Sequence, residues 1–139
     1  MLIFIPRFSK DFRIEKYFLT RRVILICNFA KSFETMKRVG IVKRIADLLH
    51  KLVPDASVIL YGSEARGDAR QDSDIDFLVL LDSEGDSFRQ QEWMITEQLM
   101  LLEAEAGVSL SPYIVPKRWW NQKTPTPFSI NVKNEGVLL

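Results

Sequence analysis

Two acidic residues stand two positions apart at the start of an apolar run in the middle of the sequence. Asp74 and Asp76 lead directly into the stretch from Phe77 to Leu81. If that run forms a strand, residues two apart point to the same side, so the two carboxylates face the same way. Without a cation they would repel each other, and Mg²⁺ removes that repulsion because it favours carboxylate oxygens. The pattern therefore predicts Asp74 and Asp76 as ligands of Mg²⁺.

A Gly-Ser pair precedes these acids, separated from them by ten residues. Gly62 and Ser63 follow the β-prone run Ser57–Tyr61. Glycine lets a backbone approach a ligand closely, and free N–H groups at the start of a following helix can bind phosphate. Ser63 adds a hydroxyl donor. Together with Asp74 and Asp76, the pair indicates a site for a metal-bound nucleoside triphosphate.

Several neighbouring residues allow both a functional and an ordinary interpretation. Arg66 could contact phosphate oxygens or form a surface salt bridge with a nearby acid. Ser73 could contact the nucleotide or simply close the turn before Asp74. Glu64 and Asp68 are expected to be solvated charges. A Gly-Ser turn or an Asp-x-Asp pair alone is common, so the inference depends on their combined spacing.

The elements that must position these residues form a small α/β domain. The expected elements are a helix over residues 37–52, a strand over 57–61, a short helix and loop over 64–70, a central strand over 75–81, a helix over 87–106, a third strand over 108–115, and a helix that starts at Thr126-Pro127 and stops at Gly136. Gly107 is expected to cap the long helix. Pro112 interrupts the third strand, which indicates an edge strand or a bulge.

Composition is that of an ordinary globular protein of one domain. The 139 residues are 47% hydrophobic and 27% charged, and the net charge of +1 gives no reason to expect nucleic-acid binding. The longest apolar run near the start, Val23–Ala30, is too short to cross a bilayer, and charged residues exclude a secretory signal pattern. The single Cys27 excludes an internal disulfide and fits a cytoplasmic location.

The charge is unevenly distributed along the chain. Residues 1–35 hold seven Lys/Arg and three acids, a balance of +4, whereas residues 36–139 hold 12 and 15, a balance of −3. Three interpretations of residues 1–35 are open: a basic extension that contacts a partner, an additional packed element, or a tail from a start codon assigned too early. We favour the third, because the self-contained pattern begins at Met36.

The motif resembles a known signature. Gly62-Ser63, ten residues, then Asp74-Ile75-Asp76 is similar to the signature of the DNA polymerase β-like nucleotidyltransferase superfamily. The sequence motif Y-G-S-x-A-R-G over residues 61–67, with Ser73 before the acids, resembles that of the minimal nucleotidyltransferase (MNT) branch. The resemblance extends over residues 36–139 and includes the ending over residues 134–138.

This resemblance implies a fold, a reaction and a partner. The fold would be of the α+β type, with a small mixed β-sheet flanked by helices. The activity would be Mg²⁺-dependent transfer of a nucleoside monophosphate, AMP from ATP or the equivalent from another NTP, to a protein hydroxyl. Asp74 and Asp76 would bind Mg²⁺, and Gly62 and Ser63 would hold the terminal phosphates. Many members act as antitoxins beside a HEPN-domain toxin, so a HEPN-domain partner is expected.

One feature departs from that family. Active members carry a third carboxylate on the strand after the long helix, where this sequence has Ser109 and Ser111. A hydroxyl is a weak metal ligand and no base near neutral pH. Glu103 or Glu105 could substitute, but both are expected to face solvent. A non-catalytic, nucleotide-binding antitoxin that acts by contact therefore stands beside the enzyme, and an aminoglycoside-type nucleotidyltransferase is a lesser alternative.

Overall fold

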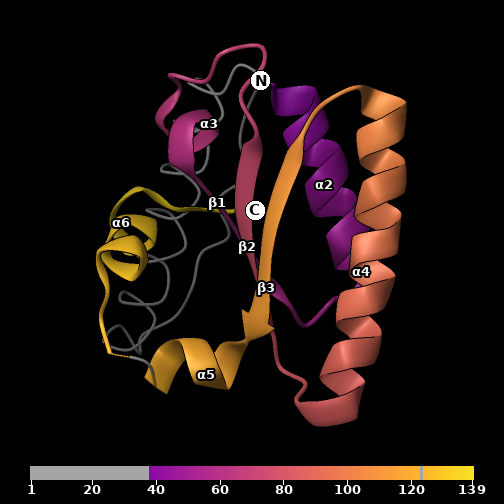
Figure 1. Ribbon diagram of the computed structural model, residues 1–139, viewed down its shortest axis with the longest axis vertical. Helices are drawn as coiled ribbons and strands as arrows, with labels where there is room; N and C mark the ends of the chain where they lie inside the picture. The colour runs from indigo at the N-terminus through magenta and orange to yellow at the C-terminus, as the bar shows by residue number, and fades with distance from the viewer. Residues whose placement is uncertain (1–37, 123) are drawn as a thin grey trace, which may run out of the picture.

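The computed structural model describes residues 38–122 and 124–139, so the expectations for residues 1–35 lie outside the described part of the chain. Figure 1 shows the arrangement of its elements. In chain order they are α2 (Val39–Leu52), β1 (Ser57–Tyr61), α3 (Gly62–Arg66), β2 (Ile75–Leu81), α4 (Gly85–Ala106), β3 (Leu110–Pro116), α5 (Lys117–Gln122), α6 (Pro127–Glu135) and β4 (Val137–Leu138).

The strands form one mixed sheet in the order β3-β2-β1-β4. β2 and β3 are parallel and are joined by α4, whereas β1 is antiparallel to both β2 and β4. Antiparallel pairing brings the end of β1 beside the start of β2, and Tyr61 lies opposite Asp76. The Gly-Ser pair that follows Tyr61 is thereby brought next to the acidic residues.

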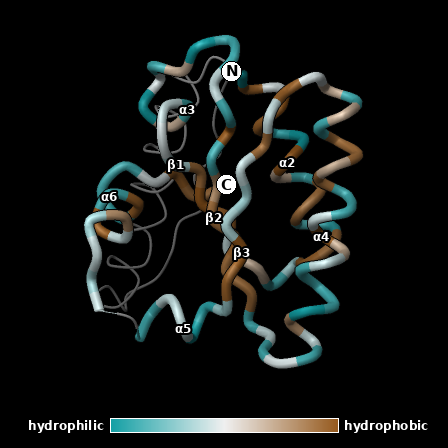
Figure 2. The backbone as a smooth tube through the Cα atoms, in the orientation of Figure 1, coloured by the Kyte–Doolittle hydropathy of each residue, from teal (hydrophilic) through white to brown (hydrophobic). Residues whose placement is uncertain are grey.

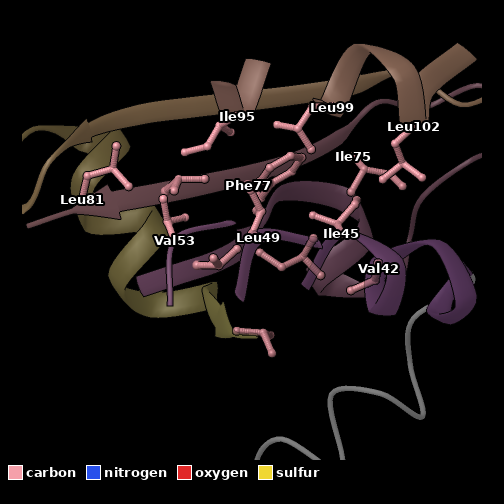
Figure 3. Close-up of a cluster of buried hydrophobic side chains, with 14 residues drawn as sticks. Val42, Ile45, Leu49, Val53, Ile75, Phe77, Leu81, Ile95, Leu99 and Leu102 are labelled. Carbon is pink, nitrogen blue, oxygen red and sulfur yellow. The ribbon is translucent and has the colours of Figure 1, made fainter. Parts of the chain in front are cut away.

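Helices cover both faces of this sheet. α2 and α4 lie side by side against one face, whereas α5 and α6 lie on the other (Figure 1). The larger core contains Ile45 and Leu49 from α2 and Leu99 from α4, which surround Phe77 (Figure 3). On the opposite face, β2 belongs to a second core that includes Trp120 of α5 and Val132 of α6.

β2 is the most buried strand because it has a helical layer on each side. Ile75, Phe77, Val79 and Leu81 belong to the larger core, and the alternate residues Leu78 and Leu80 belong to the second core. The hydropathy colouring in Figure 2 shows the apolar residues concentrated in the central strands. A strand that is buried on both faces has a nearly continuous run of apolar residues, and that run allowed β2 to be predicted from the sequence.

Most predicted elements are confirmed. The strands over 57–61 and 75–81 have the predicted bounds, and β3 with Pro112 is an edge strand. Thr126 caps α6 through reciprocal hydrogen bonds with Ser129, and Gly107 ends α4 in the left-handed conformation. α5 and β4 were not predicted. In the described ranges, every helix is too short or too polar to span a membrane.

Candidate functional site

The two acids predicted as metal ligands lie at the start of β2. Asp74 is exposed in the loop just before the strand, and Asp76 is half-buried as its second residue. Asp76 is flanked across the sheet by Tyr61 of β1 and Ser111 of β3. The buried strand therefore fixes the backbone of Asp76, while its carboxylate stays at the edge of the core.

Gly62 brings the Gly-Ser turn against this carboxylate. Its φ of +73° lies in the region that favours glycine, and a Cβ atom at this position would be 2.6 Å from Oδ2 of Asp76. α3 begins at Gly62, and the turn closes where the N–H of Asp68 donates to the carbonyl of Ser63 at 3.0 Å. The predicted proximity of Gly62 and Asp76 is thus present in the structure.

The charge of Asp76 is poorly compensated. Burial, followed by the negative charge of Asp74, raises the pKa of Asp76, whereas a hydrogen bond from Ser111 and the positive charge of Arg66 oppose this rise. The net pKa is above the ordinary value for aspartate. A divalent cation between the two carboxylates would remove both their repulsion and the cost of desolvation.

The register identifies which serine faces the acids. Ser111 lies opposite Asp76 on the neighbouring strand, whereas Ser109 is exposed before β3 and its carbonyl accepts a hydrogen bond from the N–H of Ile75 at 2.9 Å. Ser111 therefore occupies the position where the resemblance implies a third carboxylate.

Neither acid at the end of α4 takes the place of that carboxylate. Glu103 accepts a hydrogen bond from the N–H of Leu110 at 2.9 Å, and Glu105 forms an ion pair with Arg44 at 2.9 Å. Within the described ranges, no three His, Cys, Asp or Glu residues are grouped so as to hold a metal. The donor set is therefore two carboxylates and one hydroxyl.

This donor set fits Mg²⁺ only as part of a substrate complex. Mg²⁺ prefers six oxygen ligands, and protein sites commonly supply one or two carboxylates while phosphates and waters complete the shell. Asp74 and Asp76 provide that number of carboxylates. A metal held by the protein alone would need more acidic groups than the described residues gather here.

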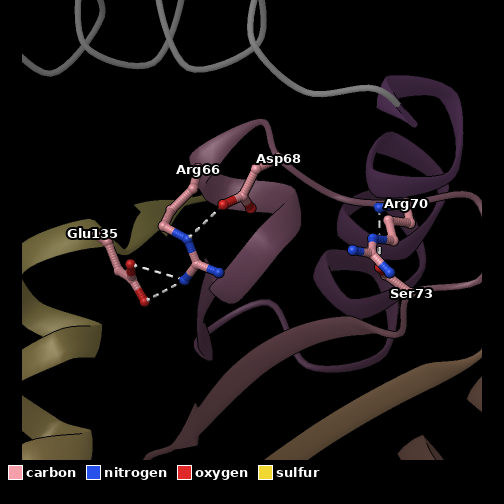
Figure 4. Close-up of polar contacts among 5 residues, drawn as sticks. All are labelled: Arg66, Asp68, Arg70, Ser73 and Glu135. Carbon is pink, nitrogen blue, oxygen red and sulfur yellow. Dashed lines mark hydrogen bonds and ion pairs between the residues drawn. The ribbon is translucent and has the colours of Figure 1, made fainter.

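Arg66 lies in a polar network at the surface of α3 (Figure 4). Its guanidinium donates to Glu135 at the end of α6, at 3.1 and 3.2 Å, and to Asp68 at 3.3 Å. The salt-bridge interpretation therefore describes the structure, and a phosphate contact by Arg66 stays a prediction.

Figure 4 also shows Ser73, whose hydroxyl oxygen accepts a hydrogen bond from the N–H of Arg70 at 2.9 Å and so closes the turn before Asp74. A nucleotide contact by Ser73 also stays a prediction.

The expectation that Glu64 is a solvated charge is wrong. Its side chain is fully buried and forms an ion pair with Arg38, the residue before α2, at 2.8 Å. The sequence held no signal for this pair, because the residues are 26 positions apart and follow no shared period.

Sequence reasoning also missed an aromatic group on the same sheet face as Asp76. Phe128 of α6 makes edge contacts with Tyr61 and Tyr113, with ring centroids 5.4 and 5.7 Å apart. Burial is the main cause that raises the pKa of Tyr61 to about 12, with the charge of Asp76 second. Tyr61 is therefore a neutral hydroxyl beside the acids at physiological pH. The alternation of side chains along β1 and β3 could have indicated that Tyr61 and Tyr113 share a sheet face with Asp76.

The pKa of Asp76 gives a first prediction, for the metal-free protein. The Asp76 carboxyl should titrate above the ordinary aspartate range when followed by carboxyl ¹³C chemical shift. Asp74→Asn removes a negative neighbour and should lower the pKa of Asp76, whereas Ser111→Ala removes a hydrogen bond to the carboxylate and should raise it. Shifts in the opposite directions would contradict the described geometry.

A second prediction concerns Gly62→Ala, with Gly85→Ala as its matched control. Both glycines have positive φ, so backbone strain alone should lower the free energy of unfolding by about 1–2 kcal/mol in either variant. A Cβ at Gly85 meets nothing within 4 Å, whereas one at Gly62 meets the Asp76 carboxylate. Urea unfolding should therefore show a larger loss for Gly62→Ala, and only that variant should shift the Asp76 carboxyl resonance. Equal losses and unshifted resonances in both variants would contradict the contact.

Comparisons with known proteins agree with this arrangement. The sequence matches the nucleotidyltransferase domain family over residues 42–138. A solved chain described as "Crystal structure of the toxin-antitoxin with AMP-PNP" is similar at 21% identity and a TM-score of 0.50, over 69% of this chain and 69% of that one. No curated protein matches significantly. At this identity the structural likeness supports the fold alone.

The family match includes all the residues that form the site. It begins within α2, contains the Gly-Ser turn and both acids, and ends in β4. The chain therefore belongs to the family of nucleotidyltransferase domains.

Proposed function

We propose that this protein binds a nucleoside triphosphate, ATP being the first candidate, and transfers its nucleoside monophosphate to a hydroxyl group of a partner protein. The observation that carries the proposal is the close approach of Gly62 to the carboxylate of Asp76. This approach supports the proposal, because a glycine turn is suited to phosphates and the neighbouring acids are suited to the metal that accompanies them.

In the proposed reaction, an acceptor hydroxyl oxygen forms a bond to the α-phosphorus. The bond between that phosphorus and the bridging oxygen to the β-phosphate breaks, pyrophosphate leaves, and the hydroxyl proton passes to solvent or a nearby base. Gly62 and Ser63 would hold the terminal phosphates, and Asp74 and Asp76 would hold Mg²⁺. When bound, Mg²⁺ would neutralise charge on the phosphate oxygens.

The proposed partner is a toxin protein, with a HEPN-domain protein as the specific expectation. The resemblance of the motif over residues 61–67 to the MNT branch motivates this expectation. The toxin–antitoxin structure with AMP-PNP makes the same pairing worth testing, although that likeness concerns the fold. A partner encoded by the adjacent gene is the first candidate acceptor.

A second candidate function is nucleotide binding without fast turnover, with neutralisation of the partner by contact. Ser111 favours it, because the register places a hydroxyl opposite Asp76 where a third acid would help activate the acceptor. Serine can donate a hydrogen bond to Asp76 but supplies no charge to a metal or base.

Incubation with ATP labelled at the α-phosphate, Mg²⁺ and the neighbouring gene product discriminates between the two functions. The enzyme proposal expects label on the partner, and Asp74→Ala/Asp76→Ala should reduce the rate by at least about 100-fold, because the metal ligands are removed. A complex that forms without label transfer would favour the binding function. Transfer that survives in the double variant would overturn the site assignment.

The missing third acid yields a separate prediction. Ser111→Asp adds a carboxylate opposite Asp76, so Mg²⁺ affinity and the rate of label transfer should rise by about 10-fold. Ser111→Asn is the matched control, because it adds similar bulk without the charge. An increase with asparagine equal to that with aspartate, or no increase with aspartate, would contradict the role of Ser111.

A further inference from the structure

Two arginine–carboxylate pairs hold α3 to helices on either side of it. Arg66 joins the end of α3 to Glu135 of α6, and this pair is exposed to solvent. Arg38 joins the start of α3 to the start of α2, through Glu64, and this pair is buried, with 15% of the Arg38 side chain and none of the Glu64 side chain exposed. Solvent and salt therefore screen the attraction between Arg38 and Glu64 much less than the attraction between Arg66 and Glu135.

Glu64 receives two hydrogen bonds from the same residue. The main-chain N–H of Arg38 donates to Oε1 at 2.8 Å, and Nε of Arg38 donates to Oε2 at 2.8 Å. Both carboxylate oxygens are therefore engaged, and the direction of the side chain is fixed. Among the described residues, Nη1 and Nη2 of Arg38 are buried without a hydrogen-bond partner, so the guanidinium depends strongly on Glu64.

The position of this pair matters because Glu64 directly follows the Gly62-Ser63 turn. α3 has only five residues, and a helix this short is not stable by itself in water. Its location depends on contacts with the rest of the protein. Gly62 packs so closely against Asp76 that even a methyl group at position 62 would meet the carboxylate. A small shift of α3 would therefore change the distance between the turn and the carboxylate.

Stability alone is a weak reason for such a pair. Replacing a buried ion pair by apolar residues of similar size is often neutral or stabilising, because the desolvation of two charges is costly. What such a pair supplies in some proteins is a unique geometry. The Glu64 carboxylate is fixed at both oxygens and directly follows the Gly62-Ser63 turn, so it is suited to fixing the geometry of that turn.

We propose that Arg38 and Glu64 are positioning residues that hold the Gly62-Ser63 turn at the separation from Asp76 that nucleotide binding requires. The inference rests on the proposed function, namely that a triphosphate binds at this turn. It adds that nucleotide affinity depends on a residue at the start of α2, which contacts neither the metal ligands nor the turn itself in any described hydrogen bond.

The test compares the full-length wild-type chain with Arg38→Met/Glu64→Leu, which replaces the pair by apolar side chains of similar size. Calorimetry with AMP-PNP and Mg²⁺ measures affinity, and thermal unfolding measures stability. We expect the Kd of the double variant to rise by about 10-fold or more while its Tm stays near that of the wild type. An exposed ion pair that joins α2 to α4, away from the turn, supplies the control: Arg44→Ala/Glu105→Ala should leave the Kd unchanged.

A gentler variant keeps the test decisive if the double variant does not fold. Glu64→Gln retains the shape of the side chain, but its NH₂ group would meet a donor of Arg38, so the turn should shift and the Kd should rise. Wild-type affinity in a folded Glu64→Gln or double variant would overturn this inference alone. Absence of AMP-PNP binding by the wild-type chain would overturn both the inference and the proposed function.

Discussion

The close packing of Gly62 against the carboxylate of Asp76 is the constraint on which the rest of the site depends. It requires the antiparallel pairing of β1 with β2, since only that pairing brings the end of one strand beside the start of the other. It also requires a residue without a side chain and with positive φ. The buried strand β2 fixes the acid, and α3 fixes the turn, so the two halves of the site are supported by different parts of the core.

The electrostatics of the site follow from this packing. Asp76 lies at the edge of the core beside Asp74, and its pKa is raised because burial and a like charge outweigh the hydrogen bond from Ser111. A site with uncompensated carboxylates is suited to a cation that brings its own remaining ligands. Two carboxylates and a hydroxyl support binding of a metal–nucleotide complex more strongly than they support fast transfer, and this difference separates the two candidate functions.

The sequence predicted what depends on local pattern and on spacing. The apolar run of β2, the cap at Thr126 and the pairing of Gly62 with Asp76 were all readable, because period, capping residues and motif spacing report directly on them. The burial of Glu64 was not readable, because its partner is distant in the chain. Nor could the choice between Ser111 and its neighbour Ser109 be made, since only the β2–β3 register decides it. α5 and β4 are short elements whose formation depends on tertiary contacts rather than on periodicity.

The most direct test of the central claim is a crystal structure with AMP-PNP and Mn²⁺, in which anomalous scattering locates the metal. We predict an Mn²⁺ ion bound by Asp74 and Asp76, with the terminal phosphates against the backbone of Gly62 and Ser63. A metal held elsewhere, or a nucleotide whose phosphates do not contact this turn, would contradict the assignment of the site.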